Sequence, residues 1–209
     1  MAANWSAFTS NLKQVFGSPN KKTISDIADL HATEYASAVL DSTIVLTGSK
    51  VTSITKPLIK IAYEQVFTSL SLLKIELKPN YAQGEAKTDI EKANRAFIES
   101  LFLPVASVIC LEWQKEIFTA STIPPGYVSP SPGYNVLVPG DPITLSKDLA
   151  KAFFISQTIL NSEESVNTFI KTLVEAYTKH MLSITGTFIG LVPGTPAVLG
   201  PPFPYVGVS

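Results

Sequence analysis

The two histidines and the single cysteine are the side chains of this 209-residue chain best suited to catalysis or metal binding. They are His31, Cys110 and His180, and they are far apart in sequence. His31 has Glu34 three residues later, a spacing that places both side chains on one face of a helix but supplies only two metal ligands. Since His31 also falls on the apolar side of its predicted helix, we predict a core or boundary histidine there.

Cys110 and His180 have equally simple interpretations. Cys110 follows the apolar run LFLPVASVI, which predicts a small buried hydrophobic residue, and as the only cysteine it can form no intrachain disulfide. His180 falls near the C-terminal end of a predicted helix, where the helix dipole favours a cation. The chain contains no GxSxG, phosphate-loop, dinucleotide-binding or HExxH motif, and its acidic residues are scattered. We therefore predict no catalytic residue, no metal site and no cofactor.

The composition argues against several classes of partner. Charged residues make up 16% of the chain, below the roughly 25% that is usual for soluble domains. Hydrophobic residues reach 45%, and the mean hydropathy is +0.24. With a net charge of −1 and Arg95 as the sole arginine, the chain lacks the basic surface that nucleic-acid binding requires. The first residues show no charged leader before an apolar core, so we expect synthesis in the cytoplasm without a secretory signal.

Apolar residues recur at helical spacing in six stretches that are bounded by capping and stop signals. Ser162 and the Thr88 and Glu91 pair are predicted caps, and Pro104 predicts a kink or a break in the fourth stretch. The length suits one domain. We predict an all-α fold, a helical bundle-like domain of five to seven helices at residues 1–185. The six stretches are 4–16, 23–43, 57–77, 88–118, 144–160 and 162–180.

The last part of the chain differs from the rest, because residues 181–209 contain no charged side chain. Residues 186–209 combine large apolar residues with five prolines, which disfavour a regular helix or a central strand. An ordinary disordered tail is polar, whereas this segment carries apolar anchors on a stiff backbone. We predict an extended apolar C-terminal arm that packs on its own domain or on a neighbouring copy.

A second segment rich in proline and glycine, residues 122–143, separates the predicted helices. Residues 134–138 have the composition of a short strand, but turn-forming residues flank them. We predict a binding or assembly loop. The alternative, that both segments merely cover the core of their own domain, stays open. The candidate protein-interface residues of the two segments are Tyr127, Tyr134, Val136, Leu137, Phe188, Leu191, Val192, Val198, Leu199, Phe203, Tyr205 and Val206.

Two other functions remain as alternatives. Residues 181–200 are uncharged and about long enough to span a bilayer, so a C-terminal membrane anchor is one of them. Its glycines and prolines, and the absence of basic residues beyond it, make a membrane partner the weaker expectation. A helical enzyme without a recognisable motif is the other, because catalytic residues can converge from distant positions.

The middle and the end of the chain resemble virion structural proteins of tailed bacteriophages. The resemblance is carried by the stretch CLEWQKEIFTASTIPPGYVSPSPG and by the terminus LSITGTFIGLVPGTPAVLGPPFPYVGVS, in which residues 202–207 are similar to a PFPFxG-like ending. It implies a non-enzymatic part of a particle, in the tail, baseplate, neck or head surface. The implied partners are further copies of the chain and other structural proteins. The implied location is the host cytoplasm during synthesis and the virion afterwards.

Overall fold

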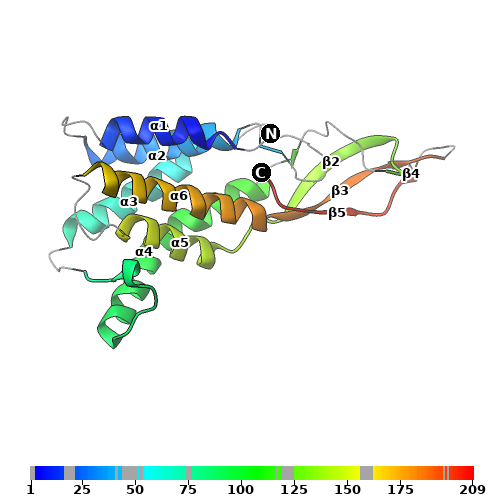
Figure 1. Ribbon diagram of the computed structural model, residues 1–209. Helices are drawn as coiled ribbons and strands as arrows, with labels where there is room; N and C mark the ends of the chain where they lie inside the picture. The colour runs from blue at the N-terminus through cyan, green and yellow to red at the C-terminus, as the bar shows by residue number, and fades with distance from the viewer. Residues whose placement is uncertain are drawn as a thin grey trace.

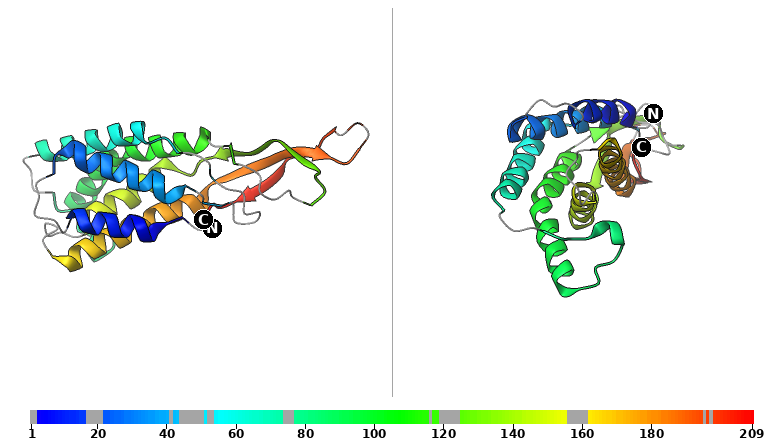
Figure 2. Two further views of the ribbon diagram at one scale, coloured as in Figure 1. Left: turned by 90° about the horizontal axis from the view of Figure 1, so that it is seen from above. Right: turned by 60° about the vertical axis from the view of Figure 1, so that its left-hand side comes forward.

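The computed structural model describes residues 3–16, 22–40, 42–43, 51, 54–73, 77–115, 117–118, 125–155, 162–194, 196 and 198–209. For residues 117–118 and 129–137 it describes the backbone alone. Most of the described residues are helical, and the rest of the regular structure is one antiparallel sheet that extends beyond one end of the helices (Figure 1). The left view in Figure 2 shows the same two-part shape from above.

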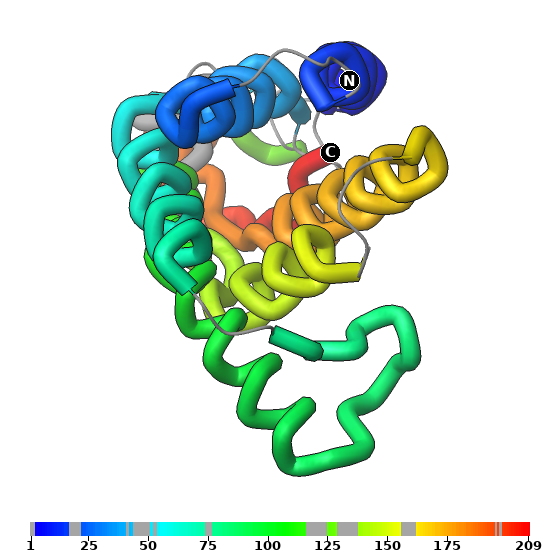
Figure 3. The backbone as a smooth tube through the Cα atoms, turned by 90° about the vertical axis from the view of Figure 1, so that its left-hand side faces the viewer, coloured from blue at the N-terminus to red at the C-terminus, as the bar shows by residue number. Residues whose placement is uncertain are grey.

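Six α-helices form the larger part of the described molecule, and Figure 3 shows them end-on, arranged around a common core. A short 3₁₀ turn, η1 (Tyr81–Gln83), precedes the fourth helix, whose first half reaches outside the bundle (Figures 1 and 3). The prediction of a mainly helical fold is therefore confirmed. The helices are α1 (Trp5–Phe16), α2 (Ile24–Val39), α3 (Lys56–Leu72), α4 (Asp89–Lys115), α5 (Pro142–Phe154) and α6 (Glu163–Ser183).

Most of the helices begin at residues whose side chains form capping hydrogen bonds, and such residues can be recognised in the sequence. The Ser162 side chain accepts a bond from the Ser165 amide at the start of α6. Thr88 and Glu91 bond reciprocally at the start of α4, at 3.1 and 3.2 Å, which is the predicted capping box. Pro104 lies inside α4 without ending it. Because Pro104 is exposed, the carbonyl that loses its helical bond can face water, and the predicted break does not occur.

Aromatic side chains dominate the core between the helices. The hydroxyls of Tyr63 and Tyr177 share a hydrogen bond, and the Trp113 indole donates to the Tyr35 hydroxyl at 2.7 Å. Trp5 stacks on Tyr177 with ring centroids 5.9 Å apart, so α1 is docked by its first residue. These contacts join five of the six helices, because α1, α2, α3, α4 and α6 each contribute one ring.

The sheet is built from the two segments for which a loop and an extended arm were predicted. Strand β2 pairs with β1 on one side and β3 on the other, while β4 and β5 pair with successive parts of β3. The order of pairing makes β3 a central strand, so the expectation that prolines exclude one was wrong. The strands are β1 (Ile117–Phe118), β2 (Ser129–Val138), β3 (Thr185–Val192), β4 (Val198–Leu199) and β5 (Phe203–Val206).

The prolines fall where a sheet tolerates them. Residues 185–192 contain none, and Pro193 and Pro196 follow β3 in the turn before β4. Pro204 lies in β5, which among the described strands pairs only with β3. A strand at the edge can carry a residue without a backbone N–H, so the sequence pattern is compatible with an ordinary sheet.

The end of the chain is tied to the helices rather than free. Ser209 and Thr43 exchange backbone hydrogen bonds of 2.9 and 2.7 Å, and Val208 donates to the Met181 carbonyl at 3.0 Å. The Val208 side chain is fully buried. The last residues of segment 186–209 therefore pack on their own domain, which is one of the two arrangements predicted for it.

Candidate functional site: the uncharged sheet

The sheet draws all its strands from two stretches that contain no Asp, Glu, Lys or Arg. These stretches are residues 117–140 and 181–209, and the sheet is the part of the molecule where they meet. The charged residues of the chain therefore all lie outside it. Only the second stretch was predicted to be an uncharged segment, although residues 117–140 lack charged side chains as well. The described strands of the sheet therefore carry no side-chain carboxylate, amine or guanidinium group.

The strands hold this surface in a defined register. Phe188 lies between Tyr134 of β2 and Phe203 of β5, and Gly186 lies between Val136 and Tyr205. Phe188 and Tyr205 are buried by their own chain, with exposed fractions of 0% and 1%. They were predicted as interface residues, but their burial leaves them nothing to offer a partner, and they belong to the internal packing of the sheet.

The other predicted interface residues divide by exposure. Val198, Leu199 and Val206 are the exposed ones, at 54%, 65% and 60%. The half-buried ones are Tyr127, Leu191, Val192 and Phe203. Tyr134, Val136 and Leu137 lie in β2 by their backbone, and their side chains are outside the described residues. Two exposed residues that the sequence reasoning did not select, Val128 and Val138, lie just before β2 and at its end.

Close packing fixes the outer end of the sheet. The Tyr127 ring contacts Phe188 edge-to-face with centroids 5.0 Å apart, and its hydroxyl donates to the Pro201 carbonyl. A Cβ on Gly200 would overlap Val192 and come within 2.8 Å of the Tyr127 ring. This end therefore requires glycine at position 200. Its packing against Tyr127 and Val192 holds the backbone next to the exposed Val198 and Leu199.

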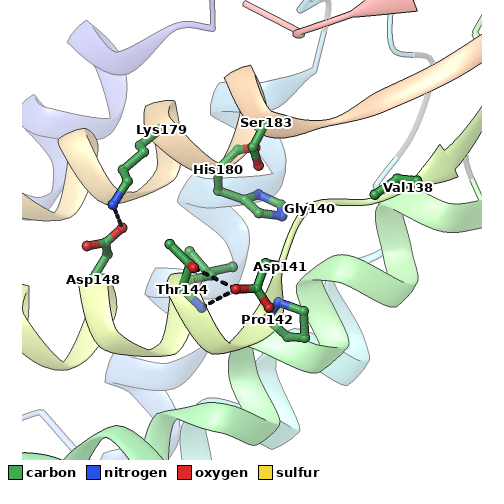
Figure 4. Close-up of a pocket in the computed structure, with 10 residues that line it drawn as sticks. Val138, Gly140, Asp141, Pro142, Thr144, Asp148, Lys179, His180 and Ser183 are labelled. Carbon is green, nitrogen blue, oxygen red and sulfur yellow. Dashed lines mark hydrogen bonds and ion pairs between the residues drawn. The ribbon is translucent and has the colours of Figure 1, made fainter.

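A cavity of about 460 Å³ lies where the sheet joins the helices (Figure 4). Its charged groups are already engaged. Asp141 accepts a bond from the Thr144 hydroxyl at 2.6 Å, and bonds from the Ile143 and Thr144 amides as the cap of α5, and these bonds lower the pKa of its carboxyl. Lys179 forms an ion pair with Asp148 at 2.7 Å. The lining is thus an ordinary set of structural contacts, and its one buried titratable group is His180.

His180 and Cys110 are neighbours in space, and they form a structural contact rather than a catalytic pair. The cysteine Sγ lies 3.5 Å from Nε2 of the imidazole, and the same Nε2 lies 2.7 Å from the Pro139 carbonyl oxygen. A carbonyl only accepts, so Nε2 carries the proton and cannot take one from the thiol. Burial lowers the pKa of His180 to about 4 and raises the pKa of Cys110 to about 12. Both groups are therefore neutral near pH 7.

This arrangement corrects one prediction and confirms another. The helix dipole does not explain His180, because the buried ring is uncharged and serves to hold the link between β2 and α5 through Pro139. Cys110 is a buried hydrophobic residue, as predicted.

His31 is the predicted core histidine, and it is fully buried. Five aromatic rings surround it with centroids 5.1 to 6.1 Å away, and neither ring nitrogen has a hydrogen-bond partner. Burial lowers its pKa to about 3. Glu34 instead accepts a bond from the Asn11 side chain at 2.7 Å, so the two do not act together. The surrounding rings belong to Phe16, Tyr63, Phe67, Phe153 and Phe169.

Within the described part of the chain, no group of three or more His, Cys, Asp or Glu side chains is placed to hold a metal ion. One described helix, α4, has the length and mean hydropathy (1.6) of a membrane span, and 44% of its most apolar window is buried. A helix of a protein core has the same composition. Residues 181–200 do not form a spanning helix, since their described part forms the end of α6 and strands β3 and β4.

Comparison of the chain with protein-family models, with curated proteins and with solved structures found no match.

Proposed function

We propose that this chain is a non-enzymatic structural subunit of a bacteriophage virion that assembles with copies of itself and with other particle proteins through the uncharged sheet. The observation that carries the proposal is the meeting of residues 117–140 and 181–209 in one projecting sheet without charged side chains (Figure 1). The resemblance to virion proteins suggests a place in the tail, baseplate, neck or head surface of the particle.

Exposed apolar side chains support an interaction role for this sheet. Val198, Leu199 and Val206 are each more than half exposed, and Val128 and Val138 add to the same sheet. Exposed apolar side chains on a sheet offer surface that subunits of closed assemblies can bury against one another. Because about half of each side chain is still exposed, complete burial by a partner would contribute roughly 1 to 2 kcal/mol for each valine or leucine.

The contact would use the face of the sheet rather than its β5 edge. Pro204 lies at the middle of β5 and has no backbone N–H, so a strand added along this edge would lack one hydrogen bond. Natural sheets use proline at edges in this way to prevent strand addition. Side-chain packing against Leu199 and Val206 is the remaining mode of contact for this part of the sheet.

Charged side chains placed at two exposed positions of the sheet test the assembly role. We expect the Leu199→Asp, Val206→Asp double variant to remain folded and to associate about tenfold or more weakly than the unchanged chain, as measured by light scattering over a range of concentrations. Ile143→Asp is the matched control, because Ile143 is 56% exposed but lies in α5. Equal association of both variants and the unchanged chain would refute a role for the sheet.

Membership in a particle needs a separate measurement. Mass spectrometry of gradient-purified phage particles made from the genome that encodes this chain should detect it at a fixed ratio to the major particle proteins. Its absence from intact particles would refute the virion assignment, even if the sheet does mediate association.

A further inference from the structure

The imidazole of His180 holds the junction between the sheet and the helices, and only one of its two nitrogens is hydrogen-bonded to oxygen. Nε2 lies 2.7 Å from the Pro139 carbonyl oxygen, while Nδ1 is buried without a hydrogen-bond partner. The ring also packs directly against Gly140, because a Cβ there would lie 2.6 Å from Cδ2. The link that leads from β2 into α5, residues 139–141, therefore rests on this ring.

The charged form of the ring is not satisfied in this position. A protonated imidazole donates from both nitrogens, so an imidazolium here needs an acceptor at Nδ1 as well. Cys110 of α4 lies 3.5 Å from Nε2 and is a neutral thiol, because burial raises its pKa to about 12. Burial also lowers the pKa of His180 to about 4. The junction as built thus accommodates the neutral ring.

The cavity beside the ring offers the charged form a better position. Two carboxylates line this cavity together with His180, and its rim includes Lys179, whose side chain is 61% exposed (Figure 4). Asp148 is paired with Lys179, and Asp141 is ionised well below pH 7, since bonds from the Thr144 hydroxyl and from backbone amides lower its pKa. An ionised carboxylate stabilises a nearby imidazolium. The described titratable side chains around the ring are Cys110, Asp141, Asp148 and Lys179.

We propose that His180 forms a pH-dependent contact, in which protonation turns the ring from Pro139 into the cavity toward the two carboxylates and frees the link between β2 and α5. The junction between the sheet and the helices then opens locally, while the helical core stays folded. The proposal concerns the junction, so it goes beyond the assembly role of the sheet and does not depend on it.

The direction of the pH dependence follows from the two positions of the ring. In the closed junction the ring resists protonation, whereas an imidazole in water has a pKa of about 6.5. The closed junction is therefore most stable above about pH 6.5, and its stability falls as the pH is lowered toward 4. With these two pKa values, the equilibrium constant for opening rises about twentyfold between pH 7 and pH 5.

Cys110 reports the opening, because its Sγ lies beside the His180 ring and it is the only cysteine of the chain. Dithiodipyridine at low concentration labels the thiol in the folded chain and in the urea-denatured chain at the same pH. The ratio of the two rates gives the equilibrium constant for opening. The measurement uses His31→Phe, in which His180 is the only histidine. We expect the constant to rise about twentyfold between pH 7 and pH 5.

The matched control is His180→Gln in the same background. A glutamine amide can donate to the Pro139 carbonyl in place of Nε2, but it does not take up a proton between pH 7 and pH 5. We expect the equilibrium constant for opening in this variant to be the same at both pH values. An equal rise in both chains, or no rise in either, overturns the proposal.

Urea unfolding of the same chains separates local opening from loss of the whole fold. We expect the constant from Cys110 labelling at pH 5 to exceed the constant for global unfolding by about tenfold or more. Equal constants overturn the proposal, since global unfolding then exposes the thiol. Labelling requires no association between copies, so the result is independent of the role proposed for the sheet.

An NMR titration covers the case in which His180→Gln does not fold. In His31→Phe the ring protons of His180 are the only histidine signals, and they report directly when the ring becomes charged. We expect the ring to remain neutral wherever Cys110 remains protected from labelling. A ring that titrates near pH 6.5 while Cys110 stays protected shows that the closed junction tolerates the charge, and it overturns the proposal.

Discussion

At the scale of single residues, His31 combines complete burial with two ring nitrogens that have no partner. Its surroundings are aromatic rings that offer no hydrogen-bond acceptor to the ring nitrogens, so burial disfavours the charged imidazolium. Desolvation lowers the pKa of His31 to about 3, whereas an unfolded histidine has a pKa of about 6.5. The folded state thus excludes a proton that the unfolded state binds, and stability depends on pH through this residue.

The resulting prediction concerns acid unfolding. The contribution of neutral His31 is fully present above about pH 6.5 and is lost progressively as the pH falls toward 3. At pH 4.5 the loss should be roughly 2 to 3 kcal/mol, from two pH units at about 1.4 kcal/mol each. We expect His31→Phe to remove this part of the loss between pH 7 and 4.5, as measured by urea unfolding at both values. An unchanged difference between the two pH values in His31→Phe would contradict the assignment.

At the scale of elements, the link between β2 and α5 is held by a close contact that permits only glycine. Gly140 has φ +88°, and a Cβ there would lie 2.6 Å from Cδ2 of His180 and 2.7 Å from its Nε2. Gly126 has nearly the same φ, +89°, but nothing lies within 4 Å of its Cβ position. An alanine at Gly126 therefore measures the cost of the backbone conformation alone, and an alanine at Gly140 measures that cost together with a steric clash against His180.

We expect Gly126→Ala to cost about 1 kcal/mol of unfolding free energy, and Gly140→Ala to cost at least about 2 kcal/mol more. The difference arises because the buried His180 ring must move and lose its bond to Pro139. Urea unfolding of both variants measures it. Equal losses would show that the link tolerates a methyl group against His180.

The sequence predicted the helices far better than the sheet, for a physical reason. Caps such as Thr88 with Glu91 and the apolar spacing along α6 are local, so they can be read from neighbouring residues. The pairing of β2 with β3 joins residues about fifty positions apart, so no pattern among neighbouring residues indicates it. The prolines of residues 186–209 were read as excluding a central strand, although they lie after β3, between β4 and β5, or in the edge strand β5.

The sequence identified the apolar segments that form the candidate surface, but not which of their residues are exposed. The exposure of Leu199 and Val206 agrees with the residues chosen from sequence, while the burial of Phe188 and Tyr205 does not. Which apolar residues face inward depends on the strand register, and register follows from the pairing that the sequence did not show.

At the scale of the whole molecule, the C-terminal segment is both a candidate interaction surface and a part of the core. Phe188, Tyr205 and Val208 are buried, and Ser209 is bonded to Thr43. We therefore expect a chain ending at Thr185 to lose cooperative unfolding, since it loses three buried side chains and the central strand of the sheet. Circular dichroism during heating measures this. A truncated chain that unfolds at the temperature of the full chain would contradict the role of β3 and β5 in the core.

The absence of charge from the sheet has a consequence for the conditions under which its contacts persist. Dissolved ions screen charges over a Debye length of about 8 Å at 0.15 M, so they weaken exposed ion pairs such as Lys179 with Asp148. The contact proposed for the sheet has no charged side chain on this chain's side, and salting-out ions strengthen apolar contacts. We therefore expect the proposed contact to hold or to strengthen as the salt concentration rises, and to weaken mainly on cooling, because hydrophobic association weakens at low temperature.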